Sequence, residues 1–123
     1  MLYVANAFSF NMFNFVPEVL TQSELNEFEA RELLMGGNFI SVVGHADTAA
    51  VLSKVLHHEV KFNRASTKFE YGDHILVCQY IGPRLEEGAT ELPEGATIKF
   101  ILVRPRKKED IGCYHCGPSC VQW

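Results

Sequence analysis

Short apolar stretches separated by polar turns run along this chain, and their spacing predicts β-strands. The candidate strands cover residues 2–5, 15–20, 39–43, 66–71, 74–81 and 97–103. The proline at position 17 places the second of these at a sheet edge, because proline cannot donate a ladder hydrogen bond. Gly72 and Asp73 predict a tight turn that joins strands 66–71 and 74–81 as a hairpin.

Helical spacing occurs in two places between these strands. Residues 21–24 read Thr-Gln-Ser-Glu, which is a capping box, and apolar residues then follow at helical intervals until the glycines at positions 36 and 37. A second helix is expected to start with Asp47 or Thr48 as its cap. Residues 82–96 contain three glycines and two prolines, which predicts a long loop. The whole pattern predicts an α+β fold, a small mixed β-sheet of four or five strands flanked by helices.

The length of 123 residues suits a single domain, which we place at residues 1–106, followed by a cysteine-containing tail at residues 107–123. With 47% apolar and 21% charged residues, the composition is that of a globular protein. No apolar run approaches the length of a membrane span, and the first residues lack the pattern of a secretory signal. We therefore expect a soluble, cytoplasmic protein without membrane contact.

The net charge of −4 argues against a protein that coats nucleic acid, which is normally basic. Arg31 is the one lysine or arginine in residues 1–53, whereas residues 54–108 carry the other ten. This distribution favours a compact anion site in the second half of the chain, and no long nucleic-acid partner is expected.

Four cysteines do not indicate a disulfide framework in this chain. Cys78 lies in an apolar stretch and is expected to be buried and inert. Cys113, Cys116 and Cys120 lie close together near the C-terminus with His115 between them, a set that could bind zinc. Structural zinc sites usually take their ligands from two separate turns, so a flexible or redox-sensitive tail is the favoured interpretation. We therefore assign no metal site and expect no cofactor.

Three polar segments interrupt the apolar stretches, whereas the motifs of nucleotide triphosphatases, serine hydrolases and zinc proteases are missing. Residues 6–11 alternate amide and hydroxyl side chains with phenylalanines, which suits recognition of a nucleobase but equally describes a turn over core aromatics. Residues 44–48 place His45 where a helix begins, close to backbone amides that attract phosphate. A simple packing role for this histidine is the alternative.

Residues 84–88, Arg-Leu-Glu-Glu-Gly, open the long loop. Arginine binds phosphate well, and a nearby glutamate can orient it or hold a hydroxyl group, although an ordinary solvated turn has the same composition. Asn63 and Arg64 form a further candidate phosphate contact with the same alternative. A loop of this length in a small domain is usually functional.

Together these segments resemble the viral type III anti-CRISPR ring nucleases and their bacterial relatives, small proteins that destroy the second messenger cyclic tetra-adenylate. The shared sequences are Tyr-Val-Ala-Asn-Ala-Phe-Ser at 3–9, Val-Gly-His at 43–45, Asn-Arg at 63–64 and Arg-Leu-Glu-Glu-Gly at 84–88. Gln79 and the pair Asn11-Met12 also match. These sequences occur in the order and spacing of the family, and the resemblance covers residues 1–103.

The resemblance implies a homodimer that holds one cyclic tetra-adenylate in a pocket across its two-fold axis. It also implies metal-independent cleavage into linear di-adenylates that end in 2′,3′-cyclic phosphate, which would antagonise type III CRISPR signalling. His45, Arg84 and Glu87 match the catalytic residues of the family. The ligand-binding positions of the family correspond to Asn6, Ser9, Asn11, Gly44, Thr48, Arg64 and Gln79.

These roles agree with the chemistry of the reaction. A ribose 2′-hydroxyl can attack its own 3′-phosphate in line if the protein holds the geometry, neutralises the phosphorane and protonates the leaving 5′-oxygen. His45 suits the proton donor and Arg84 the phosphate, while Glu87 positions either Arg84 or a ribose hydroxyl. Asp47 either caps the second helix or brings a negative charge beside the ring.

Two alternative functions remain open from the sequence. A protein with the same pocket could bind the ring without cleaving it and so act as a sponge. The third hypothesis is a regulatory module that meets a partner through a zinc-bearing tail. In that case replacement of Cys113 and Cys116 would release stoichiometric zinc.

Overall fold

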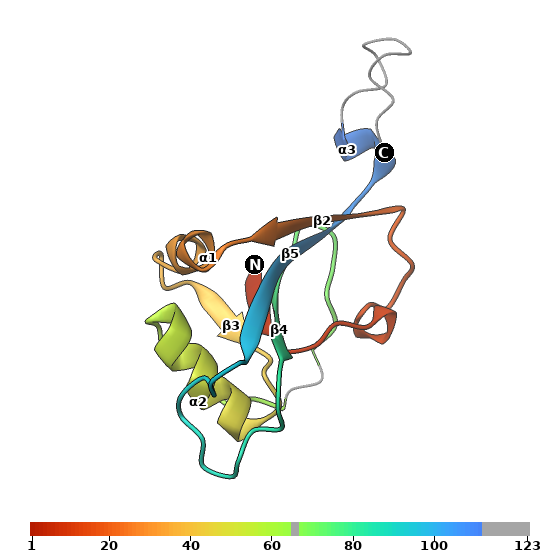
Figure 1. Ribbon diagram of the computed structural model, residues 1–123. Coiled ribbons are helices and arrows are strands. Elements are labelled where there is room, and N and C mark those ends of the chain that lie inside the picture. Colours follow the sequence, from red (N-terminus) through yellow and green to blue (C-terminus); the bar gives the residue numbers. More distant parts are fainter. Residues whose placement is uncertain (65–66, 112–123) are drawn as a thin grey trace.

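A five-stranded mixed sheet forms the centre of the protein in the computed structural model, which describes residues 1–64 and 67–111 (Figure 1). Its strand order is β2-β5-β4-β1-β3, with bounds Leu2–Ala5 (β1), Val19–Leu25 (β2), Phe39–Ser41 (β3), His74–Ile81 (β4) and Thr97–Arg106 (β5). β1 runs parallel to β3 and β4, whereas β5 is antiparallel to β4 and β2. The predicted α+β fold class is therefore confirmed.

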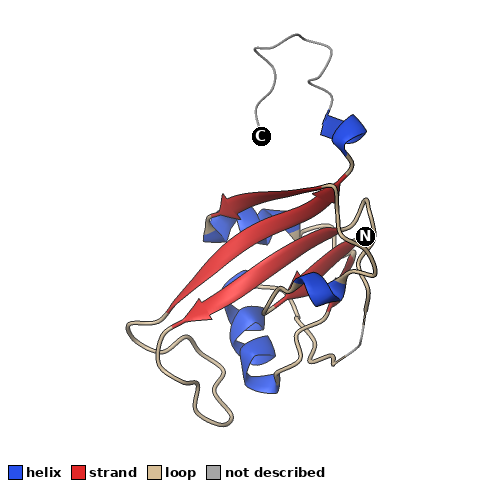
Figure 2. Ribbon diagram, turned by 90° about the vertical axis from the view of Figure 1, so that its right-hand side faces the viewer, coloured by secondary structure: helices blue, strands red, loops and turns tan. Residues whose placement is uncertain are grey.

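Two helices cover one face of this sheet. α1 spans Glu27–Leu33 and α2 spans Ala46–Leu56, and Figure 2 shows both on the same side of the strands. Leu76 and Cys78 of β4 face these helices. The core between the two layers consists of Val4, Ala30, Leu34, Val43, Ala49, Leu52, Leu56, Val60, Leu76, Cys78 and Phe100. Removal of this apolar surface from water is the main force that holds the helices on the sheet.

A second, smaller core lies on the opposite face of the sheet, under loops instead of α-helices. The 3-10 helix η1 (Phe10–Met12) and residues 67–71 cover it. Phe69 is fully buried there, with its ring centroid 4.9 Å from that of Tyr3 and 5.9 Å from that of Phe13. The Phe69 N–H donates to the Met12 carbonyl at 2.8 Å, which fixes the two covering segments to each other.

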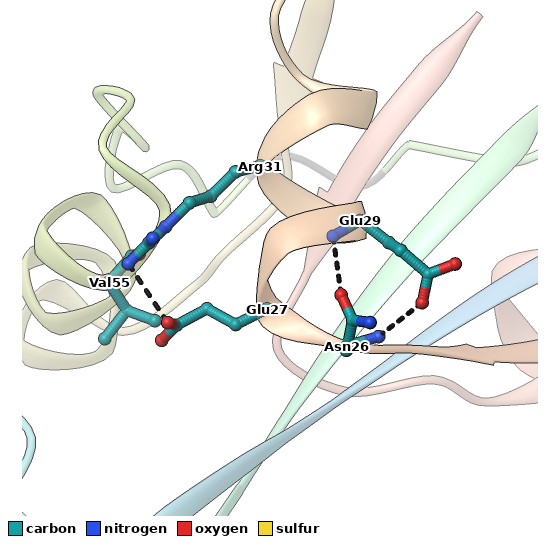
Figure 3. Close-up of polar contacts among 5 residues, drawn as sticks. All are labelled: Asn26, Glu27, Glu29, Arg31 and Val55. Carbon is teal, nitrogen blue, oxygen red and sulfur yellow. Dashed lines mark hydrogen bonds and ion pairs between the residues drawn. The ribbon is translucent and has the colours of Figure 1, made fainter.

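The two α-helices are also tied to each other by Arg31 (Figure 3). Its Nε donates to the Val55 carbonyl at 2.9 Å, and its Nη2 lies 3.1 Å from the Glu27 carboxylate one helical turn earlier. The carbonyl belongs to the last turn of α2, where backbone acceptors lack partners within the helix. Arg31 therefore joins the C-terminal end of α2 to α1.

The first α-helix begins later than the sequence pattern predicts. Residues 21–24 belong to β2 and pair with β5, so the capping box predicted there is wrong, and the strand predicted at 15–20 lies instead at Val19–Leu25. The actual capping box uses Asn26 and Glu29 (Figure 3). The Glu29 N–H donates to Asn26 Oδ1 at 2.8 Å, and the Asn26 N–H donates to Glu29 Oε1 at 3.0 Å. Continuous pairing with β5 outweighs the local capping preference.

The hairpin predicted at 66–71 and 74–81 is also wrong. The described part of the first segment, residues 67–71, contains no strand, and Phe69 makes only an isolated bridge to Phe13. The reason is that β4 already pairs with β1 on one side and β5 on the other. The predicted turn itself is confirmed: the Asp73 N–H donates to the Glu70 carbonyl at 3.1 Å, and Gly72 has φ +91°.

The end of the described chain adds a short helix, α3 (Lys108–Ile111), after β5, which reaches Arg106 instead of stopping at residue 103. Within residues 1–64 and 67–111, no helix is long and apolar enough to cross a membrane. Cys78 is fully buried as predicted, and burial raises the pKa of its thiol to about 12. The predicted cysteine cluster lies outside the described residues, at Cys113, His115, Cys116 and Cys120.

Candidate active site

The three predicted catalytic residues meet in one hollow beside the start of α2, which we name the His45 pocket. It is open to solvent and has a volume of about 900 Å³. The start of α2, the end of β4 and the loop between β4 and β5 supply its lining, which consists of His45, Asp47, Thr48, Tyr80, Gly82, Arg84, Leu85, Glu86 and Glu87. In Figure 1 this loop passes next to α2. The fold thus brings together side chains that lie in separate parts of the sequence.

A tight turn holds the two glutamates of this loop. The Ala89 N–H donates to the Glu86 carbonyl at 3.0 Å, which closes a four-residue turn. Gly88 occupies its third position with φ +81°, the left-handed conformation that a type II turn requires there. The positive φ of this turn position therefore explains the glycine of the Arg-Leu-Glu-Glu-Gly segment, and Glu87 lies at the second position of the turn.

The start of α2 differs from the prediction in its cap. His45 is the N-cap residue and makes no capping hydrogen bond with its side chain, so the caps predicted at Asp47 and Thr48 are wrong. The Asp47 carboxylate instead accepts a hydrogen bond from the Gly88 N–H at 3.0 Å. Thr48 Oγ1 lies 3.5 Å from His45 Nδ1. The backbone amides of this first turn therefore have no side-chain cap, and the positive end of the helix dipole faces the pocket.

A second hollow, the Arg64 pocket, contains four of the predicted ligand-binding residues. Its volume is about 390 Å³, and it is lined by Asn6, Ala7, Phe8, Ser9, Met12, Val42, Gly44 and Arg64. Arg64 Nε donates to the Gly44 carbonyl at 3.1 Å. A Cβ atom at Gly44 would lie 3.4 Å from Arg64 Cγ, an ordinary contact, so the arginine stem passes directly beside Gly44. Because Gly44 directly precedes His45, the Arg64 pocket adjoins the His45 pocket along the chain.

A third hollow, the Gln79 pocket, lies on the sheet face opposite α2. It has a volume of about 310 Å³ and is lined by Asn6, Ala7, Phe8, Gln22, Val77, Gln79, Ile101 and Val103. Residues 6–8 therefore line both this pocket and the Arg64 pocket. Asn11 lines none of the three hollows. Its N–H donates to Ser9 Oγ at 3.2 Å, and its carbonyl accepts a hydrogen bond from Lys68 Nζ.

The segment at residues 6–11 combines the two interpretations that its sequence allowed. Ser9 is the N-cap of η1, and the rings of Phe10 and Phe13 lie 5.9 and 5.8 Å from that of Phe8. This is the capped turn over aromatics, of which Phe13 is buried and Phe10 is 63% exposed. Asn6 nevertheless lines two hollows, so the segment also presents an amide side chain where a ligand could reach it.

Sequence reasoning missed Tyr80 and Gly82 as lining residues of the His45 pocket. Alternation along β4 puts Tyr80 on the same face as Leu76 and Cys78, so the strand pattern could have identified it. The Tyr80 hydroxyl donates to the Pro83 carbonyl and so fixes the start of the loop. Gly82 could not have been found in this way, because its importance depends on how closely β5 approaches.

The charged groups of the His45 pocket are a mixed set. Asp47, Glu86 and Glu87 bring three carboxylates, against the guanidinium of Arg84 and the imidazole of His45. No ion pair within the described chain joins Arg84 to either glutamate. The arginine side chain is exposed, so it can turn toward an anionic ligand. Across the described residues there is no group of three or more His, Cys, Asp and Glu side chains that could hold a metal ion.

Fold and site together define a small α+β protein with a polar pocket between the start of a helix and a long loop. The profile of the STIV B116-like family matches residues 2–100, and this chain belongs to that family. Uncharacterized protein 26 of Sulfolobus islandicus filamentous virus (isolate Iceland/Hveragerdi) is 36% identical over 88 residues, which cover 72% of this chain and 74% of the viral protein.

A solved structure supports the same assignment. B116 of Sulfolobus turreted icosahedral virus superimposes with a TM-score of 0.69 at 29% sequence identity, covering 84% of this chain and 97% of B116. Both relatives are viral proteins. The expected relationship to a viral protein family is therefore confirmed.

Proposed function

We propose that this protein is a metal-independent ring nuclease that cleaves cyclic tetra-adenylate into linear di-adenylates with 2′,3′-cyclic phosphate ends. One observation carries the proposal: His45 from the start of α2 and Arg84 and Glu87 from the loop after β4 line the same pocket. His45 can donate a proton and Arg84 can bind phosphate, as cleavage of an RNA phosphodiester needs, and the carboxylate of Glu87 can position Arg84 or a ribose hydroxyl. By this activity the protein would switch off type III CRISPR signalling.

The proposed reaction is a transesterification at phosphorus. The ribose 2′-oxygen forms a bond to its neighbouring phosphorus as the bond from phosphorus to the 5′-oxygen breaks. The 2′-hydroxyl proton leaves to solvent, and the imidazolium of His45 donates a proton to the departing 5′-oxygen. Two such steps at opposite phosphates convert one ring into two di-adenylates without consuming water.

The surroundings of His45 suit this role. An imidazolium carries protons on both nitrogens, so Nδ1 can donate to Thr48 Oγ1, 3.5 Å away, while Nε2 keeps a proton for transfer. A bound phosphate would accept hydrogen bonds from the uncapped amides of the first turn of α2. Arg84 would then neutralise the charge that develops on the phosphate oxygens.

A homodimer is part of the proposal. A ring of four nucleotides has a two-fold axis, and an isologous dimer presents the same residues to both halves of such a ring. The open His45 pocket of one protomer would be completed by that of a second copy. The Arg64 pocket next to it offers Asn6, Ser9 and an arginine for the adenines and phosphates further along the ring.

The test is incubation of labelled cyclic tetra-adenylate with the full chain in EDTA, with products resolved over time. We expect linear di-adenylate with a cyclic phosphate end. His45→Ala should slow a single turnover by about 10²–10⁴-fold and leave ring binding almost unchanged. His57→Asn is the matched control, because it removes an exposed histidine at the other end of α2 and asparagine tolerates its φ of +56°.

The possible outcomes separate the rival functions. If the wild-type protein cleaves the ring and His45→Ala cleaves it at the same rate, another group donates the proton. A ring that stays intact but comigrates with the protein would replace the nuclease with a sponge. An intact and unbound ring would contradict both functions.

A further inference from the structure

Asp47 connects the start of α2 to the loop that carries Arg84 and Glu87. Its Oδ1 accepts a hydrogen bond from the Gly88 N–H at 3.0 Å, and its side chain is partly buried. Hydrogen bonds to ionised carboxylates are about twice as strong as those between neutral groups. Gly88 directly follows Glu87, so this bond restrains the backbone of the turn that holds the glutamate.

The other restraints on this loop act elsewhere. At its base, Gly82 is packed closely against Ala96. Further along, Lys54 of α2 forms an ion pair with Glu91, but both side chains are mostly exposed, and such pairs contribute little. The hydrogen bond from Ala89 to Glu86 shapes the turn but does not attach it to the rest of the protein. The bond from Gly88 to Asp47 is what fixes the turn against the helix that carries His45.

A carboxylate at this position conflicts with the binding of an anionic ring. Asp47 lines the same pocket as His45 and Arg84, where it would repel the phosphates of the ligand. A neutral residue would bind the ring more tightly, so the charge needs another explanation. The hydrogen bond to the loop supplies one, because the ionised group is the stronger acceptor.

We propose that Asp47 is a positioning residue: it accepts a hydrogen bond from the Gly88 N–H and thereby holds the turn that carries Glu87 beside the start of α2, while its charge weakens binding of the ring. This inference rests on the proposed nuclease function for its consequence, but its geometric part does not. Asp47→Ala removes the acceptor and the charge, whereas Asp47→Asn keeps an acceptor oxygen and removes only the charge. The two variants therefore separate the two effects.

The geometric part is tested by amide hydrogen exchange of Gly88 in the full chain without ligand. We expect exchange about tenfold faster in Asp47→Ala, because a bond to a charged acceptor is lost, and an intermediate rate in Asp47→Asn, because an amide oxygen is a weaker acceptor than a carboxylate. Glu94→Gln is the matched control, since it removes an exposed carboxylate from the same loop. Equal exchange in wild type and Asp47→Ala would overturn the proposal.

The functional part is tested by measuring single-turnover cleavage and ring binding separately. Asp47→Ala should lose about tenfold in the cleavage rate without weaker binding, and Asp47→Asn should lose less of the rate and bind more tightly at low salt. Equal rate losses in both variants, or a loss of binding in Asp47→Ala, would overturn it. If the wild-type protein does not cleave the ring, the proposed function fails, and Gly88 exchange alone decides whether Asp47 holds the turn.

Discussion

Replacement of Gly82 by alanine tests the close packing at the base of the loop that carries Arg84. An added Cβ would lie 2.6 Å from Ala96 Cβ and 2.9 Å from Ala96 Cα. These distances are about 1 Å shorter than the optimal separation of two carbon atoms. Ala96 is buried and has no rotatable side chain, so the backbones at the ends of β4 and β5 must separate. Overpacking of this kind destabilises a protein by about 1–3 kcal/mol.

Urea unfolding of the full chain measures this effect. A loss of about 2 kcal/mol should lower the midpoint by roughly 1 M, because the slope for small proteins is about 1–3 kcal/mol per molar urea. Gly36→Ala is the control for the added methyl group alone, since no heavy atom lies within 4 Å of a Cβ built there; the φ of +157° at Gly82 adds backbone strain that this control does not carry. Its midpoint should be unchanged or slightly higher, because alanine reduces the conformational freedom of the unfolded chain.

A double-mutant cycle assigns the loss to the contact itself. Ala96→Gly removes the atom closest to the added Cβ, so Gly82→Ala should destabilise that background less, with a coupling energy of at least about 0.5 kcal/mol. A wild-type midpoint for Gly82→Ala would refute the close approach at this point, whereas full additivity would assign the loss to the Ala96 backbone and to the φ of +157° at Gly82 instead of the Ala96 methyl group.

Four further predictions follow from the described residues. Arg84→Ala should slow cleavage of the ring by about 10²-fold and weaken its binding less, since the charge is needed most in the transition state; equal losses would make Arg84 a plain binding contact. Phe69→Ala should lower the free energy of unfolding by about 3–5 kcal/mol, measured in urea, because Phe69 is fully buried between the sheet and η1; a loss under about 1 kcal/mol would contradict that packing. Burial raises the pKa of the Cys78 thiol to about 12, so Cys78 should react with iodoacetamide at least about 10²-fold more slowly in the native protein than in urea. Mass spectrometry of the peptide that contains Cys78 measures this rate. Burial and the nearby Arg104 lower the pKa of His74. The folded state therefore binds fewer protons than the unfolded state, and the free energy of unfolding falls as the pH drops below about 6.5. His74→Gln should show a smaller fall in this free energy between pH 7.5 and 5, whereas an unchanged fall would assign the effect to other groups.

The parts of the fold that the sequence predicts well are those with strong hydrophobic patterns. β1, β4, β5 and α2 were all placed correctly to within a few residues, because most of their side chains on one face are buried. β2 was misplaced because it is an edge strand with few buried residues, so its Thr-Gln-Ser-Glu run has the composition of a helix start. Pairing with β5, about 80 positions away in the sequence, makes this segment a strand instead of a helix start. Local sequence patterns hold no information on such distant pairing.

The candidate site was predictable in its residue types but not in its connections. His45, Arg84 and Glu87 were identified from chemistry and family resemblance, and the fold places them in one pocket. The hydrogen bond between Asp47 and Gly88 could not be predicted, because it depends on how the loop after β4 folds back onto α2. The same holds for the contact of Gly82 with Ala96. Neither contact leaves a periodic signal in the sequence.

The position of β1 within the sheet has a consequence for synthesis of the protein. Residues 2–5 lie between β3 and β4, and Leu2 pairs with both Phe39 and His74. During translation, one edge of β1 can pair once β3 has left the ribosome, but the other stays open until β4 emerges. Pairing over such separations slows folding and exposes strand edges meanwhile. β1 therefore stays half-paired until β4 has been made, which leaves one of its edges exposed to aggregation in that interval, and β2 waits longer still because its partner is β5.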